Sequence, residues 1–170
     1  FGSLRYLFGE VNLFLAYYDN PKLIHDINRH LTDFWLAIFE KVLTKFSVDS
    51  IKFWEDMAFK NGPMISKDLF REFMSPYYKE MIGNLKSFGI SNFIVDSDGD
   101  CRELIPLWME CGITGLLPNE VQAGMDIVKL REEFSDLQLF GGLDKKKLTG
   151  SKRDIEGELE KVKKILKYGG

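Results

Sequence analysis

Apolar residues in the first half of the chain recur at spacings typical of amphipathic helices. Asn20-Pro21 offers an N-cap followed by proline at the first helical position, which predicts a helix start. From residue 24 to residue 46 the apolar positions repeat every three or four residues, which predicts one long amphipathic helix. A further helix is predicted from about residue 66 to residue 85. Pro76 should kink or split it, because proline removes a backbone donor.

Short apolar runs then alternate with helical patterns. They predict strands at 50–57, 92–96, 113–117 and 137–140, with Gly62-Pro63 in a loop. Helices are predicted at 102–111, at about 123–134, and after a capping-box-like Ser151 and Asp154. The strand period of roughly 20–25 residues fits βα units of a parallel sheet or barrel. The predicted fold is therefore α/β and of TIM-barrel type.

Four strands cannot close an eight-stranded barrel, so the chain is expected to hold about half of one. We find no linker, so residues 1–170 are expected to form a single domain. The chain opens without Met and stops directly after a predicted helix, which suggests a fragment. An isolated half-barrel would leave open sheet edges and an exposed apolar inner face. Pairing with another copy, as a homo-oligomer, is therefore expected.

Composition narrows the class of protein. Of the 170 residues, 45% are hydrophobic and 29% charged, which is the balance of a soluble globular protein. The net charge of −3 argues against nucleic acid as a partner, and no apolar run is long enough to cross a membrane. Cys101 and Cys111 are expected to be reduced thiols of an intracellular, cytoplasmic protein.

The candidate chemistry lies where the predicted strands end. In a parallel sheet these ends converge on one face, so their side chains should form one pocket for a small-molecule substrate. Crowded carboxylates would raise each other's pKa unless a cation compensates, which suits acid–base work, cation binding, or binding of a cationic or hydroxyl-rich ligand. Some of these residues could instead only cap the helices that follow. The strand ends offer Glu55, Asp56, Asp96, Asp98, Asp100, Glu120, Gly141, Gly142 and Asp144.

Metal sites are not expected. The spacing of Asp96, Asp98 and Asp100 resembles a calcium loop, but Cys101 stands where an EF-hand needs glycine. His25 and His30 are not adjacent on their predicted helix, and the two cysteines lack a C-x-x-C spacing. The histidines are therefore interpreted as structural or surface residues. The run 145–147 of three lysines is interpreted as a solvated loop or helix approach.

The order of motifs resembles the carboxyl-terminal half of the uroporphyrinogen decarboxylase superfamily, which includes corrinoid and coenzyme M methyltransferases. The matching segments span nearly the whole chain: residues 15–21, 65–77, 93–100 with Leu104, 110–112 and 140–144. The resemblance implies a TIM barrel with its active site at the carboxyl ends of the strands. This agrees with the placement of the acidic residues derived above.

The resemblance also implies a carboxy-lyase that acts on a porphyrinogen or a related small molecule without a cofactor. Asp56, Asp96 and Asp98 would be catalytic and stabilise positive charge on a protonated pyrrole. Substrate-binding residues would be Glu55, Asp100, Glu120, Gly141, Gly142 and Asp144. Because acidic groups alone would repel substrate carboxylates, the cations that bind them are expected to come from outside this chain.

Two alternatives stay open. The first is a methyltransferase-like protein that moves a methyl group to or from a corrinoid. The methyltransferases carry a His-x-Cys zinc pair after the strand that here ends in Asp96 and Asp98, so both ligands are replaced by aspartate. The second alternative is a non-catalytic barrel fragment or a sugar- or small-molecule-binding relative.

Overall fold

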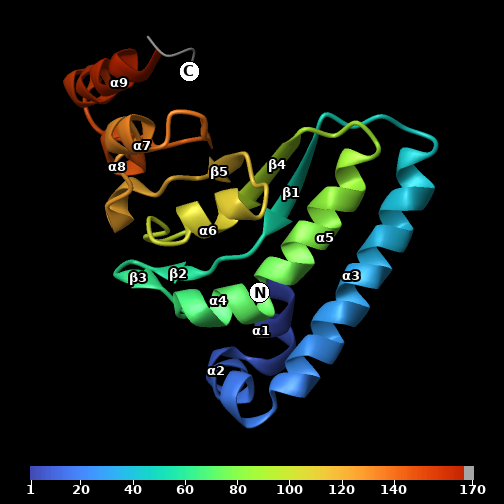
Figure 1. Cartoon of the computed structure of the whole chain (residues 1–170). Helices are drawn as coiled ribbons and strands as arrows, with labels where there is room; N and C mark the ends of the chain where they lie inside the picture. The colour runs from blue at the N-terminus through green and yellow to red at the C-terminus, as the bar shows by residue number, and fades with distance from the viewer. Residues whose placement is uncertain (167–170) are drawn as a thin grey trace.

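The structure is a computed structural model that describes residues 1–166 of the chain (Figure 1). The amino-terminal helices are α1 (Gly2–Phe8), α2 (Glu10–Asp19) and α3 (Pro21–Leu43). The strands are β1 (Ser50–Trp54), β2 (Ala58–Phe59), β3 (Gly62–Pro63), β4 (Asn92–Asp96), β5 (Gly115–Leu117) and β6 (Gln138–Leu139). The later helices are α4 (Lys67–Phe73), α5 (Ser75–Lys86), α6 (Ile105–Glu110), α7 (Ile127–Glu133), α8 (Lys145–Leu148) and α9 (Lys152–Leu166), with a 3₁₀ turn, η1, at Val121–Ala123.

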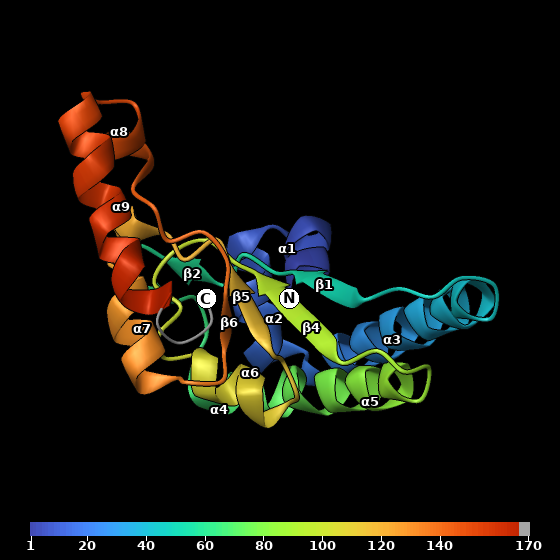
Figure 2. The ribbon, with the colours of Figure 1, turned by 90° about the horizontal axis from the view of Figure 1, so that it is seen from above.

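Within residues 1–166 the main sheet has four strands in the order β1-β4-β5-β6, and every neighbouring pair is parallel. This order follows the chain, so each crossover moves in the same direction and its helix falls on the same face. Figure 2 shows α4, α5 and α6 on one side of the sheet. The predicted α/β fold with TIM-barrel-type units is confirmed. The four strands are half of those in an eight-stranded barrel.

The two faces of the sheet differ in what covers them. Ile51, Phe93, Val95 and Leu116 are buried in the core beneath the helices. The opposite face carries polar pairs, with Lys52 Nζ 2.9 Å from Asp96 Oδ2 and Gln138 Nε2 donating to Asn92 Oδ1 at 2.7 Å, beside the half-exposed rings of Trp54 and Phe140. The expectation of an apolar inner face is therefore only partly right, because polar side chains alternate with the rings.

Helix α4 ends at Phe73 and α5 begins at Ser75, so the predicted split near Pro76 is confirmed. Ser66 caps α4 by accepting from the backbone N–H of Leu69 at 3.2 Å. At the other end of the chain, Asp154 Oδ2 accepts from the backbone N–H of Ser151 at 2.9 Å, and Ser151 Oγ accepts from that of Asp154 at 3.3 Å. The predicted capping box at the start of α9 is confirmed.

Two elements near β1 differ from prediction. Strand β1 ends at Trp54 instead of running to Met57, because Asp56 has a φ of 48° and turns the chain out of the sheet. Gly62-Pro63, predicted as a loop, forms β3 and pairs antiparallel with β2.

Several carboxyl-terminal helices are shorter than predicted. Helix α6 begins at Ile105 instead of residue 102, with Pro106 in its first turn. The helix predicted at about 123–134 is divided into η1 and α7 by Gly124, which has a φ of 91°, and Asp126 caps α7. Lys145 to Lys147 lie in the short helix α8. Within residues 1–166 we find no helix with both the length and the apolar character needed to span a membrane.

Candidate functional site

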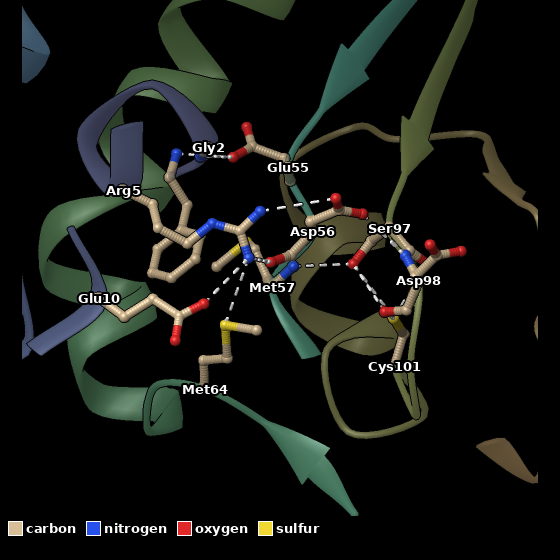
Figure 3. A network of polar contacts seen from close by, with 11 residues as sticks. Gly2, Arg5, Glu10, Glu55, Asp56, Met57, Met64, Ser97, Asp98 and Cys101 are labelled. Carbon is tan, nitrogen blue, oxygen red and sulfur yellow. Dashed lines mark hydrogen bonds and ion pairs between the residues drawn. The ribbon is translucent and has the colours of Figure 1, made fainter. Parts of the chain in front are cut away.

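The loops that follow the strands are bonded to one another at one rim of the sheet. Asp56 Oδ1 accepts from the backbone N–H of Asp98 at 3.1 Å (Figure 3). From the other side, Glu120 Oε2 accepts from the backbone N–H of Gly99 at 3.2 Å. The loop after β4 is thus held between the loops after β1 and β5. The structure brings Asp56, Asp98 and Glu120 together, as the parallel sheet predicts.

Asp98 occupies the middle of this group. Within residues 1–166 its carboxylate receives no hydrogen bond, although its backbone N–H is bonded to Asp56. Partial burial, and then the neighbouring charges of Asp56, Glu120 and Asp96, raise the pKa of the Asp98 carboxyl above its usual range. Asp98 therefore keeps a proton to higher pH than an isolated aspartate, which suits proton transfer.

The other acids of the group each have a cation nearby. Arg5 Nη2 lies 3.5 Å from Asp56 Oδ2, Lys52 Nζ lies 2.9 Å from Asp96 Oδ2, and Lys145 Nζ lies 3.7 Å from Glu120 Oε1. These three cations belong to the chain and pair with its own acids, and the expectation that the cations for substrate carboxylates come from outside the chain stays a prediction.

Sequence reasoning missed Arg5, Lys52 and Lys145 as site residues, and of the three Arg5 is the farthest in sequence from the acid that it contacts. It comes from α1, 51 positions before Asp56. The available signal was weak: Arg5 is the one charged residue among the first nine, in an otherwise largely apolar segment. Nothing in that local pattern tells which strand end it will reach.

Glu55 lies apart from this group. It is 7% exposed and points toward the helices, where Oε1 accepts from the Tyr78 hydroxyl at 2.6 Å and Oε2 from the backbone N–H of Gly2 at 2.9 Å. Burial, and then the Glu55 charge, raise the pKa of Tyr78 well above its usual value. Glu55 and Asp56 are adjacent in sequence, yet the first joins the core and the second joins the loops (Figure 3).

Asp100 and Asp144 also have bonded partners. Asp100 Oδ1 accepts from Arg102 Nε at 2.8 Å, and Arg102 Nη2 contacts its other oxygen. These bonds lower the pKa of Asp100. Asp144 caps α8 through the backbone N–H of Lys146 at 2.9 Å and accepts from Gln122 Nε2 at 2.9 Å. Their predicted roles in substrate binding stay predictions.

A small cavity of about 90 Å³ lies between the loops after β4, β5 and β6. Its polar lining includes Asp98, Asn119, Glu120, Gln122, Asp144 and Lys145. Ligand sites for drug-sized molecules are usually about 300 Å³ or more, so this cavity fits only one group of a ligand. A larger, mostly apolar cavity of about 360 Å³ lies between α3, α5 and β1, and of the strand-end acids discussed above only Glu55 lines it.

The glycines at the end of β6 allow two loops to approach closely. A Cβ on Gly141 would lie 2.2 Å from the carbonyl oxygen of Pro118, and one on Gly142 would lie 2.0 Å from Ile127 Cγ2. Both have positive φ, 85° and 74°. The backbone N–H of Gly142 donates to the Pro118 carbonyl at 2.9 Å. Packing between loops accounts for these glycines, and their contact with a ligand stays a prediction.

In the described part of the chain, we find no group of three or more His, Cys, Asp or Glu side chains arranged to hold a metal ion. His25 instead contacts the Tyr77 hydroxyl through Nδ1 at 2.9 Å, between α3 and α5. Cys101 and Cys111 are free and buried. Burial raises the pKa of the Cys101 thiol to about 12. The residues present do not fit the zinc site of the methyltransferase-like alternative.

A rim of acidic loops at the carboxyl ends of parallel strands is typical of enzymes built on β/α-barrel units. The family model for "Uroporphyrinogen decarboxylase (URO-D)" matches residues 4–169, and the chain belongs to this family.

Proteins named uroporphyrinogen decarboxylase are among its relatives. The one from Chlorobium phaeobacteroides is 28% identical over 166 residues, which cover 96% of this chain and 43% of the relative. The one from Chlorobaculum tepidum is 26% identical over 148 residues, which cover 86% of this chain and 40% of the relative. The chain thus spans about two fifths of the length of the curated relatives it matches.

Proposed function

We propose that this chain supplies the acid–base residues of the active site of a carboxy-lyase, and that the substrate is a porphyrinogen or a related small carboxylic acid. The family and the names of the relatives support this class of reaction. The observation that carries the proposal is Asp98, an exposed carboxyl with a raised pKa between two fixed carboxylates.

Decarboxylation replaces a carboxyl group on carbon by a proton, and CO₂ leaves. When the carbon is attached to a pyrrole, protonation of the ring creates positive charge that draws electrons from the breaking C–C bond. In our proposal Asp98 gives the ring its proton; after CO₂ leaves, a proton from solvent adds to the carbon that carried the carboxyl group, and the ring returns its proton to Asp98. Asp56 and Glu120 are preorganised by their hydrogen bonds to backbone amides and stabilise the positive charge. This chemistry requires no cofactor.

The cations of this rim would act on the rest of the substrate. Lys52 and Lys145 are exposed at their tips, with 56% and 77% of their side-chain surfaces accessible. Asp96 and Glu120 neutralise part of their charge, but both lysines lie beside the acids and not among them, so substrate carboxylates would be drawn to the edges of the site and not to its centre. The small cavity beside Asp98 would admit one ring substituent, and the body of the substrate would lie over the open face of the sheet.

The test is substitution of Asp98 by Asn in the full-length protein, with uroporphyrinogen as the substrate and release of CO₂ as the signal. Asparagine keeps the size of the side chain but cannot transfer the proton. We expect kcat to fall by about 10²–10⁴-fold, the range for loss of a general acid or base. Asp136→Asn, at an exposed aspartate that precedes β6 and so lies away from the carboxyl ends of the strands, is the matched control and should change kcat little. Turnover of uroporphyrinogen by Asp98→Asn at the unsubstituted rate would refute the proposed role.

A further inference from the structure

The backbone at Asp56 is strained. Its φ of 48° lies in the left-handed region, which residues other than glycine rarely adopt. Among the described residues, Asn119, after β5, is the other non-glycine residue with a positive φ, at 56°. Its side chain stabilises that turn by donating from Nδ2 to the carbonyls of Leu116 and Phe140, both at 2.9 Å. Asp56 needs a different restraint, since its own carboxylate is bonded to the Asp98 backbone N–H.

Arg5 supplies that restraint. Its Nη1 donates to the backbone carbonyl of Asp56 at 3.0 Å, while Nη2 lies 3.5 Å from Asp56 Oδ2. One planar guanidinium thus contacts both the strained peptide and the carboxylate of the same residue (Figure 3). The Arg5 side chain is only 18% exposed, and its guanidinium carbon lies 5.9 Å from the centroid of the Trp54 ring. The contact with the Trp54 ring and the two contacts with Asp56 together leave the Arg5 side chain little conformational freedom.

The effect of Arg5 reaches Asp98 through Asp56. When Asp56 is held, its Oδ1 accepts from the Asp98 N–H at 3.1 Å and fixes the start of the loop after β4. Three other bonds join the same segments without Arg5: Met57 N–H to Ser97 Oγ and Glu55 N–H to the Asp96 carbonyl, both at 2.9 Å, and Asp56 N–H to that same carbonyl at 3.4 Å. Loss of Arg5 should therefore release Asp98 without separating the strands.

We infer that Arg5 is a positioning residue: it holds Asp56 in its strained turn so that Asp56 fixes the loop that carries Asp98. The importance of this for catalysis rests on the proposed function, but the restraint itself does not. Lysine cannot replace arginine here, because its single ammonium cannot contact the carbonyl and the carboxylate in one plane. Methionine keeps the length and loses both contacts.

Amide hydrogen exchange tests the restraint without reference to any substrate. In Arg5→Met of the full-length protein, exchange at the Asp98 amide should rise by roughly tenfold or more, as expected for release of a charge-assisted hydrogen bond. The amide of Met57, bonded to Ser97, should stay within about twofold, because that bond is independent of Arg5. Arg5→Lys should show an intermediate rise. The matched control is Arg29→Met, since Arg29 pairs with Glu80 and Asp33 at the surface and should leave the Asp98 amide unchanged.

A double substitution tests whether Arg5 acts on Asp98 through Asp56. Asp56→Gly removes both the strain and the carboxylate, so Arg5→Met in that background should change exchange at Asp98 no further. Two results would overturn the inference: an unchanged Asp98 amide in Arg5→Met, or an equal rise at Asp98, Met57 and the core of β4, which would mean general destabilisation.

Turnover of uroporphyrinogen adds a functional readout. A positioning role predicts a lower kcat for Arg5→Met with KM nearly unchanged, and partial recovery in Arg5→Lys. If the exchange results hold but the unsubstituted protein does not decarboxylate uroporphyrinogen, the proposed function fails while the inference about Arg5 stands.

Discussion

Replacement of Asp98 by Asn should make the protein more stable, although Asp98 is the residue expected to matter most for activity. Its raised pKa means that the folded state disfavours the ionised carboxyl. That cost reaches its full size once the pH is above the raised pKa of Asp98, where the carboxyl is ionised in the folded and unfolded states alike. It disappears as the pH falls below the usual aspartate range, because Asp98 is then protonated in both states. The stabilisation by Asp98→Asn should follow the same pH dependence.

The magnitude is modest because Asp98 is exposed. Partial burial and repulsion from Asp56, Glu120 and Asp96 disfavour its charge, and solvent screens each repulsive contact to a few tenths of a kcal/mol. The total gain should be about 0.5–1 kcal/mol at pH 7. For a chain of this size, a change of 1 kcal/mol shifts Tm by roughly 2–4 °C, so Tm should rise by about 1–4 °C.

Asp100→Asn is the matched comparison, because the same chemical change two residues away should have the opposite sign. Its bonds to Arg102 lower the pKa of Asp100, so they stabilise the folded state above the usual aspartate range and are lost as the pH falls. Thermal melts of the three proteins at pH 7 and at about pH 3 decide the matter. A lower Tm for Asp98→Asn at pH 7, or an increase in Tm that persists at about pH 3, would show that the neighbouring charges do not destabilise the ionised Asp98 carboxyl.

Four further outcomes follow from the packing and from the open edge of the sheet. Gly142→Ala should lower the free energy of unfolding by about 2 kcal/mol or more, because the new Cβ would clash with Ile127 and the φ of Gly142 is positive. Gly157→Ala in α9, where the space around the glycine is open, should raise the free energy of unfolding by about 0.5–1 kcal/mol. Denaturant titration measures both changes. Tyr78→Phe removes the hydroxyl bonded to the buried Glu55 carboxylate and should cost about 1.5–3 kcal/mol in the same titration, and an unchanged midpoint would contradict that bond. Among the described residues β1 has a strand neighbour on one side only, so the 170-residue chain should sediment as a dimer or larger species, and a stable monomer would argue against this.

The parallel sheet and the rim of acids could be predicted because their signals are local. Short apolar runs at regular intervals identify the strands, and consecutive βα units impose parallel order, so Asp56, Asp98 and Glu120 had to meet at one edge. Helix starts at Asn20 and Ser66 were predictable for the same reason, since a capping residue lies next to the turn it stabilises.

Which acid joins the core and which joins the rim could not be predicted, because this depends on partners that are distant in sequence. Glu55 is separated by 23 positions from Tyr78, and Asp56 by 51 from Arg5. Whether a strand-end carboxylate faces the core or the rim is set by the turn after the strand, and the positive φ of Asp56 follows from a tertiary contact. The pattern at 50–57 predicts only that an acidic strand end exists.

The contacts explain how several carboxylates can share one rim without opposing the fold. Asp56 and Glu120 each accept a backbone N–H from the loop after β4, so their charges join three loops together. A cation lies near each of them, Arg5 near Asp56 and Lys145 near Glu120, and this offsets part of their mutual repulsion. Asp98 receives no such bond among the described residues, so the electrostatic cost of the cluster falls on its carboxyl, which in our proposal exchanges a proton with the substrate. The proposed proton transfer requires this arrangement, in which the outer carboxylates are held ionised by bonds and cations while the charge of the central carboxyl is disfavoured.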